Sequence, residues 1–129
     1  VAKAIAKRDK ARIVPTGNYA INRLGLSTQV PLNVVYLTDG AARKIRVGNR
    51  VINFKRTVPR NLAAIGEISK LAIQALKAIG QKEVTQEQIE KIQQLLKKEK
   101  RNHLQHDIRL APEWIRKIML PALEEEQNG

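Results

Sequence analysis

The sequence predicts an α+β fold in which a small antiparallel sheet from the first half of the chain packs against helices from the second half. β-prone runs separated by turn residues fill most of the first sixty positions. From Asn61 onward the apolar residues instead recur at three- and four-residue steps, which is the helical period. The 129 residues are 43% hydrophobic, enough to build one core, so we expect a single domain over residues 1–129.

The pattern of the first thirty residues predicts short helices and a short β-prone piece. A thin apolar stripe over residues 1–10 suits a short helix, and residues 11–14 form a β-prone piece. The following stretch, PTGNYAINRLGLSTQVP at residues 15–31, predicts a small helix over 18–24 with Gly25 as its left-handed C-terminal cap. We interpret the polar residues of this stretch as caps and turn-formers, which makes it a structural connector.

Three later runs predict strands. Residues 33–38, 43–47 and 50–57 are rich in β-branched and aromatic side chains. The dipeptide Gly48-Asn49 separates the last two runs, and such a two-residue turn is a strong hairpin signal. The turn also sets the register of the hairpin. It pairs Arg43 with Phe54, Ile45 with Ile52, and Val47 with Arg50.

This register separates an apolar face of the hairpin from a basic one, because side chains alternate between the two faces of a strand. The apolar face carries Ile45, Val47, Ile52 and Phe54, flanked by Arg43 and Arg50. The basic face carries Lys44, Arg46 and Lys55, with Val51 and Asn53.

In the second half of the chain, the spacing of the apolar residues predicts helices. The first begins at Asn61 and ends before Gly80. The second begins at Thr85, where Gln88 completes a capping box. The cations of KKEKR, residues 97–101, are expected in the last turns of this second helix, where the helix dipole favours them.

A third helix is predicted to begin at Pro112, because proline is favourable in a first helical turn. Pro121 is expected to bend or end this helix. We expect residues 124–129 to be a frayed tail.

The positive charge is concentrated in the first half of the chain. The net charge is +12, and residues 1–60 hold 13 Lys/Arg against 2 Asp/Glu, which leaves 11 Lys/Arg against 10 Asp/Glu in the remainder. A polyanion is the expected partner of such a chain, as nucleic acid or as the acidic face of another protein.

The basic hairpin is the candidate for function. Residues 41–60 hold seven Lys/Arg and no acid, and we expect these side chains to contact phosphates, which gives salt-dependent affinity but little reading of sequence. The predicted nucleic-acid-binding residues are Arg43, Lys44, Arg46, Arg50, Lys55, Arg56 and Arg60. Tyr36 and Phe54 are expected on or near the core side, so binding of single strands by base stacking is not predicted.

No set of residues points to catalysis or to a cofactor. No cysteine is present and no phosphate-binding glycine motif occurs. The one metal-like group is His103, His106 and Asp107, and it is a weak candidate because structural metal sites usually need four well-placed ligands. We therefore expect a protein that is not an enzyme, with an ordinary helix end or turn as the alternative explanation of these three residues.

The composition also indicates the setting of the chain. The lack of cysteine fits a reducing compartment, and no apolar run approaches the roughly 18–20 residues of a membrane span. We expect a cytoplasmic protein with no membrane partner. The first residue is Val1 rather than Met, so we expect a fragment or processed product that lacks an upstream domain.

Several phrases of the sequence resemble the AbiEi-type antitoxin and transcriptional-regulator family. They are PTGNYAINRLGLSTQVP, VVYLTDG, RKIRVGNRVINFKRT and PRNLA. The resemblance covers roughly Val1 to Leu76 and is strongest to the C-terminal domain of short bacterial members that are described as a domain of unknown function.

The resemblance implies an N-terminal winged helix-turn-helix that binds DNA ahead of the domain seen here, and this chain departs from the family pattern because it lacks that winged helix. It also implies repression of the protein's own operon and antagonism of a partner toxin of the nucleotidyltransferase type. Three functions stay open. The basic hairpin assists DNA binding, or the domain acts through protein contacts, either by neutralising an acidic toxin or by forming a homodimer through its helices. The third and weakest is a residual enzyme that uses His103, His106 and Asp107.

Overall fold

The computed structural model describes the backbone of residues 1–127 and the side chains of residues 1–124. Within these residues it contains six α-helices, a short 3-10 helix (η1) and a four-stranded sheet, which confirms the α+β class. The elements in chain order are α1 (Ala2–Arg8), β1 (Ile13–Pro15), α2 (Gly17–Arg23), β2 (Asn33–Thr38), β3 (Arg43–Val47), β4 (Arg50–Arg56), η1 (Pro59–Leu62), α3 (Glu67–Ile79), α4 (Gln86–Leu96), α5 (Arg101–Ile108) and α6 (Glu113–Gln127).

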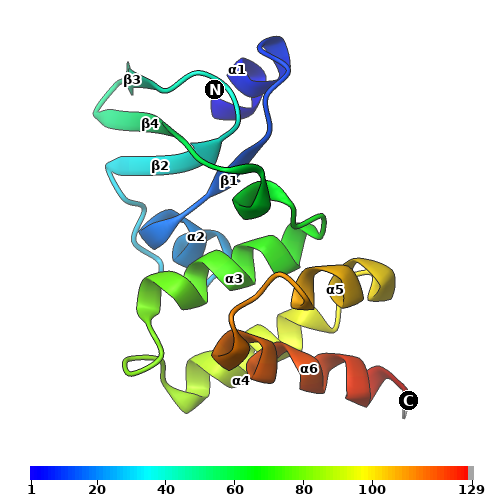
Figure 1. Cartoon of the computed structure of the whole chain (residues 1–129). Helices are drawn as coiled ribbons and strands as arrows, with labels where there is room; N and C mark the ends of the chain where they lie inside the picture. The colour runs from blue at the N-terminus through cyan, green and yellow to red at the C-terminus, as the bar shows by residue number, and fades with distance from the viewer. Residues whose placement is uncertain (128–129) are drawn as a thin grey trace.

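The elements form successive layers. Figure 1 shows the sheet with α1 at one end of the molecule and α4, α5 and α6 at the other, with α2 and α3 between them. None of the described helices is both long and apolar enough to cross a membrane.

The sheet is mixed, so the prediction of an antiparallel sheet is wrong in one pairing. The strand order is β1-β2-β4-β3. The β1–β2 and β3–β4 pairs are antiparallel, but β2 and β4 run parallel. The apolar content of the strands explains this order. β4 contributes the buried Phe54 and takes a central place beside β2, whereas β3, with the sequence RKIRV, is exposed at four of its five residues and takes the edge.

The predicted register of the hairpin is confirmed. Arg43 pairs with Phe54, Ile45 with Ile52 and Val47 with Arg50. Gly48 has φ +61 in the turn, a left-handed conformation that glycine adopts without steric cost.

Two separate clusters of apolar side chains form the core. The smaller cluster lies between α1 and one face of the sheet, and its buried members are Ala2, Val34, Tyr36 and Phe54. The larger cluster lies among the helices. It includes Leu76, Leu96, Leu104, Ile115 and Met119, none of which is exposed to solvent. The sheet thus depends on α1 for cover of one face, and the helical core is built against α2 and α3.

The first long helix begins later than predicted. α3 starts at Glu67 rather than at Asn61, and residues 59–62 form the 3-10 helix η1 instead. The physical reason is a set of contacts from distant parts of the chain, described below, that fix the backbone of Ile65 and Gly66 ahead of the helix.

The segment KKEKR is also placed differently from the prediction. The capping box of α4 is confirmed, because the Gln88 N–H donates to Thr85 Oγ1 over 3.1 Å and the Thr85 N–H donates to Gln88 Oε1 over 3.0 Å. However, α4 ends at Leu96, and Arg101 begins a further helix, α5, that was not predicted. The chain turns between them because the Glu99 side chain is buried and bound to α3.

The last helix passes through its proline. α6 begins at Glu113, directly after Pro112, and continues past Pro121 to Gln127, so Pro121 does not end it. The predicted frayed tail overlaps this helix as far as Gln127. Asn128 and Gly129 lie outside the described residues.

Two buried carboxylates hold the start of α3. Glu99 is 9% exposed, and its Oε1 accepts hydrogen bonds of 2.8 Å from the backbone N–H groups of Ile68 and Ser69 and from Ser69 Oγ. Asp107 is fully buried and accepts from the N–H groups of Ile65, over 2.8 Å, and Gly66, over 2.7 Å. A helix start has N–H groups with no partner inside the helix, and here acids from the α4–α5 region supply those partners. We call this arrangement the α3 carboxylate cap.

Gly66 leaves room for the α3 carboxylate cap. Its backbone angles, φ −79 and ψ 134, are ordinary for any residue, so the glycine is not required by conformation. A β-carbon at this position would instead overlap Glu99 Oε1 and Ser69 Oγ. Glycine is therefore needed here because the carboxylate of Glu99 lies against the backbone.

We predict that Gly66→Ala lowers the free energy of unfolding by about 1–3 kcal/mol, the usual cost of overpacking a buried site. The added methyl group must displace Glu99 from the α3 carboxylate cap. Urea denaturation followed by circular dichroism measures the change. In a Glu99→Ala background the same substitution should cost clearly less, and an equal cost in both backgrounds would contradict the role given to Glu99.

Candidate functional site

The predicted basic residues are divided between the two faces of the sheet and its ends. All are exposed except Arg50, which is half-buried. The register places Arg43 and Arg50 on the face that α1 covers, because each lies two residues from Ile45 or Ile52 on the same strand and therefore shares its face. Arg56 ends β4, and Arg60 lies in η1. The structure therefore does not bring all seven cations to one surface.

The opposite face of the sheet carries the other three cations. Cross-strand pairing aligns its side chains in three rows. These rows are Val14–Leu37–Lys55, Val35–Asn53–Lys44 and Asn33–Val51–Arg46. We call this set of residues the open face, because apart from the buried Val14 its members are half-buried or exposed and belong to neither core cluster.

Among the described residues, the cations of the open face are not paired with acids. No acidic residue belongs to the three rows, and within the described part of the chain Lys44, Arg46 and Lys55 form no ion pair. The two acids of the first half pair with arginines that lie elsewhere. Asp9 is bound to Arg8 and Arg43, and Asp39 is bound to Arg12.

Asp39 has a structural role in its turn. It accepts hydrogen bonds from the backbone N–H of Arg12, over 2.8 Å, and from the guanidinium of Arg12, over 3.0 Å. The backbone hydrogen bond and then the guanidinium hold the pKa of the Asp39 carboxyl below its usual value. The contact ties the end of β2 to the start of β1, so Asp39 is not a candidate for chemistry.

The aromatic side chains of the sheet lie on the α1 side. Tyr36 stacks on Phe54 and meets Tyr19 edge-on, with ring centroids 5.8 Å apart in each pair. Tyr36 and Phe54 are each 5% exposed, which confirms that they point to the core and cannot stack on bases. Burial raises the pKa of Tyr36 above its usual value. Burial also acts to raise the pKa of Tyr19, but hydrogen bonds with Tyr36 and Arg23 outweigh it and lower that pKa.

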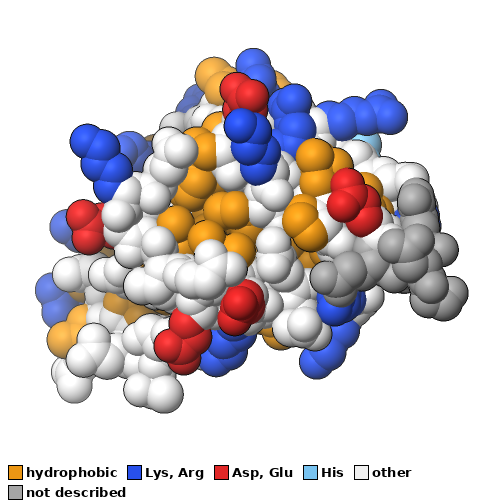
Figure 2. Space-filling view, turned by 90° about the horizontal axis from the view of Figure 1, so that it is seen from below, with side chains coloured by type: hydrophobic (Ala, Val, Ile, Leu, Met, Phe, Trp, Pro, Cys, Tyr) orange, Lys and Arg blue, Asp and Glu red, His pale blue; other side chains and the backbone are white. Residues whose placement is uncertain are grey.

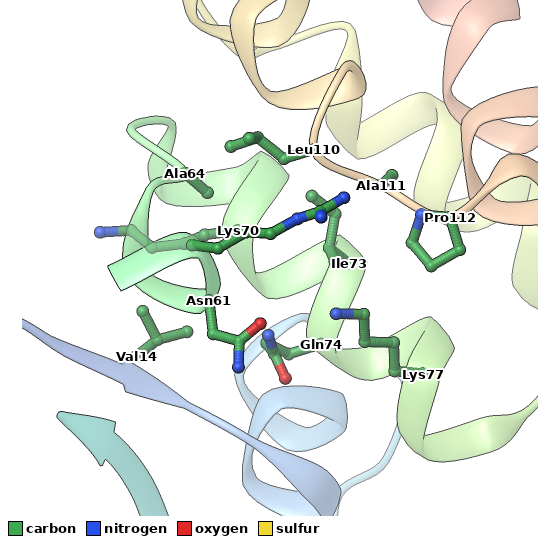
Figure 3. Close-up of a pocket in the computed structure, with 11 residues that line it drawn as sticks. Val14, Asn61, Ala64, Lys70, Ile73, Gln74, Lys77, Leu110, Ala111 and Pro112 are labelled. Carbon is green, nitrogen blue, oxygen red and sulfur yellow. The ribbon is translucent and has the colours of Figure 1, made fainter. Parts of the chain in front are cut away.

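A pocket of about 350 Å³ lies between η1, α3 and the loop that joins α5 to α6. We call it the η1–α3 pocket. It is lined by Val14, Arg60, Asn61, Ala64, Lys70, Ile73, Gln74, Lys77, Leu110, Ala111 and Pro112. Figure 3 shows Asn61 and Gln74 extending into the same space, with Lys77 beside them and Pro112 across from them. Sequence reasoning identified Arg60 but missed Asn61, Gln74 and Lys77, because no local pattern indicates that these positions meet.

The three residues proposed as a metal group do not form one. Asp107 Oδ1 lies 2.8 Å from His106 Nδ1, but both oxygens of Asp107 also accept backbone hydrogen bonds in the α3 carboxylate cap. Across the described residues, no group of three or more His, Cys, Asp or Glu side chains is placed to hold a metal ion. Asp107 is thus a helix-capping residue, and His103 is a half-buried residue of α5.

A second surface is apolar. Figure 2 shows apolar side chains gathered in the middle of the face seen from below, at the end of the molecule where α4 and α6 lie. A shallow groove of about 470 Å³ there is lined by Gln81, Val84, Ile89, Glu113, Trp114, Lys117 and Ile118. The predicted homodimerisation through the helices stays a prediction.

Comparison with known proteins gives one family. The model of a family described as "Family of unknown function (DUF6088)" matches residues 1–104. No curated protein and no solved structure matches the chain. The match covers all four strands and ends within α5, so it includes the open face and most residues of the η1–α3 pocket.

We predict that Asp107→Asn lowers the free energy of unfolding by about 1–3 kcal/mol, because an amide cannot accept both backbone hydrogen bonds and leaves a buried N–H without a partner. His103→Ala should change it by no more than about 0.5 kcal/mol. Urea denaturation with and without EDTA measures both effects. A loss of wild-type stability in EDTA that matches the loss in Asp107→Asn would show instead that Asp107 holds a metal.

Proposed function

The chain belongs to the DUF6088 family, which is described as a family of unknown function, and we propose its function from the geometry and from the resemblance. It is a non-enzymatic domain of an antitoxin-like transcriptional regulator, and it contacts DNA through the open face. The proposal includes a cytoplasmic setting and an AbiEi-type relationship. Sequence-specific reading of an operator would come from a winged helix-turn-helix of the kind that the resemblance implies.

The open face is the observation that carries this proposal. Three exposed cations project from it, no acid lies among its residues, and the two acids of the first half are bound to arginines outside it. Lys44 and Arg46 are two residues apart on the edge strand β3, about 7 Å along the strand at the usual rise per residue. A set of unpaired cations with free access is suited to the phosphates of a nucleic acid backbone.

The neighbouring cations extend this surface without belonging to the open face. Arg56 stands at the end of β4 and Arg60 lies in η1, and both are exposed. Lys55 and Arg56 point to opposite faces of β4, so a phosphate backbone that follows the open face would meet Lys55 directly and reach Arg60 at the entry to the helices. Arg43 and Arg50 contribute only to the general positive field.

A second function is favoured by the apolar residues of the open face. Val35, Leu37 and Val51 are half-buried there and lie beside the cations, which stand on the β3 and β4 side of this face. An apolar patch bordered by polar or charged residues is typical of a protein interface. The alternative proposal is that the same surface binds an acidic protein, such as a toxin of the nucleotidyltransferase type, without direct DNA contact.

We predict that Lys44→Glu with Arg46→Glu weakens binding to short double-stranded DNA and lowers the slope of log Kd against log salt concentration by about 1–2, since each lost phosphate contact removes about 0.9. Fluorescence anisotropy titrations at several salt concentrations measure both quantities. Lys82→Glu with Lys98→Glu is the matched control, because it makes the same change of charge at exposed positions of the helical half.

If the two double variants weaken DNA binding equally, the loss is due to net charge alone, and this would contradict a DNA contact at the open face. For the alternative, the chain is co-expressed with the product of the adjacent gene and examined by size exclusion. A stable complex that excludes DNA, and that the Lys44/Arg46 variant disrupts, would favour the protein partner.

A further inference from the structure

We propose that the η1–α3 pocket binds a phosphate-bearing ligand of about mononucleotide size, a nucleoside phosphate either free or at the end of a strand. The proposal does not depend on DNA binding by the open face. It rests on the charges, the amides, the apolar floor and the size of the pocket.

The pocket is positively charged, and within the described residues only one of its three cations is paired with an acid. Arg60, Lys70 and Lys77 line it, and no acidic side chain is among its described lining residues. Lys70 Nζ is bound to Glu67 Oε1 over 3.1 Å, and Figure 3 shows the Lys70 side chain directed away from the other labelled residues. Arg60 and Lys77 form no ion pair within the described part of the chain. Two unengaged cations at one pocket are suited to a phosphate group.

The remaining polar groups suit the rest of a nucleotide. Asn61 and Gln74 present side-chain amides in the same space (Figure 3), and each amide offers two N–H donors and one acceptor. Such amides bind the polar edges of nucleobases. Asn61 donates to Thr57 Oγ1 over 2.7 Å, which fixes its orientation, whereas Gln74 forms no side-chain hydrogen bond within the described residues and is free to meet a ligand.

The apolar floor and the volume of the pocket also suit a ligand of mononucleotide size. Val14, Ile73 and Ala111 are each 5% exposed or less, and they form an apolar floor below the polar groups. A volume of about 350 Å³ falls at the low end of the range for small-molecule sites. An apolar floor, a few convergent polar groups and a cationic rim describe a site for a small ligand with a phosphate at one end and a flat, polar-edged body at the other.

The polar side chains of the pocket do not take part in the α3 carboxylate cap, which holds its walls in place. The pocket is enclosed by η1 and α3, which follow each other in the chain, and by the distant α5–α6 loop. The α3 carboxylate cap fixes the turn between η1 and α3, so Asn61 and Gln74 are held without taking part in the cap. The pocket is therefore pre-formed, which lowers the cost of ordering side chains on binding.

Isothermal titration calorimetry with the four ribonucleoside 5′-monophosphates, the matching nucleosides and inorganic phosphate tests the proposal. At least one monophosphate should bind, more tightly than its nucleoside and than inorganic phosphate. Lys77→Gln should weaken this binding by roughly tenfold or more, as expected for loss of a hydrogen bond to a charged group. Lys82→Gln, an exposed lysine outside the pocket, should leave it unchanged.

A tetranucleotide with and without a 5′-phosphate distinguishes the two sources of the ligand. Binding of mononucleotides assigns the pocket to free nucleotides. Phosphate-dependent binding of the tetranucleotide alone assigns it to strand ends. Absence of binding by every phosphorylated probe, or equal affinity of Lys77→Gln and wild type, overturns the proposal. Because Lys77 is exposed on α3 and lies outside the open face, its variant should keep the affinity for double-stranded DNA, which separates failure here from failure of the proposed function.

Discussion

The rest of the structure depends on the two carboxylates that cap α3. Four backbone N–H groups at the start of this helix would lack partners in a buried setting, and leaving such groups without hydrogen bonds is costly. Glu99 and Asp107 provide those partners from more than 29 residues away along the chain. The contact fastens the C-terminal helices to α3 and fixes where η1 ends. In this way a constraint in the helical half determines the shape of the surface beside the sheet.

Local patterns were enough to predict features that local forces determine. The Gly48-Asn49 turn and the alternation of side chains gave the hairpin register, and the Thr85–Gln88 spacing gave the capping box. The parallel pairing of β2 with β4 could not be predicted in this way, because it depends on which strand is apolar enough for the centre of the sheet. The start of α3 and the existence of α5 were missed for a related reason. Both depend on buried contacts of acids that, in sequence, resemble ordinary surface charges.

The same distinction applies to the candidate sites. The basic face of the hairpin could be predicted because alternation alone places Lys44, Arg46 and Lys55 together. The η1–α3 pocket could not, because Asn61, Gln74 and Pro112 meet only after the helices pack. The metal group suggested by His103, His106 and Asp107 illustrates the opposite error. Its spacing suits a metal, but Asp107 is committed to backbone N–H groups. The described molecule thus has a basic sheet half suited to a polyanion and a nearly neutral helical half that supports it.

Amide hydrogen exchange of the chain with and without double-stranded DNA tests the central claim, contact of DNA with the open face, most directly. The backbone of the β3–β4 hairpin lies behind the open face, and β3 is an unprotected edge of the sheet. We predict that DNA slows exchange in residues 43–56 and leaves α4 and α6 unchanged. Protection confined to α4 and α6, with none in the hairpin, would contradict the assignment of the open face as the DNA-binding surface.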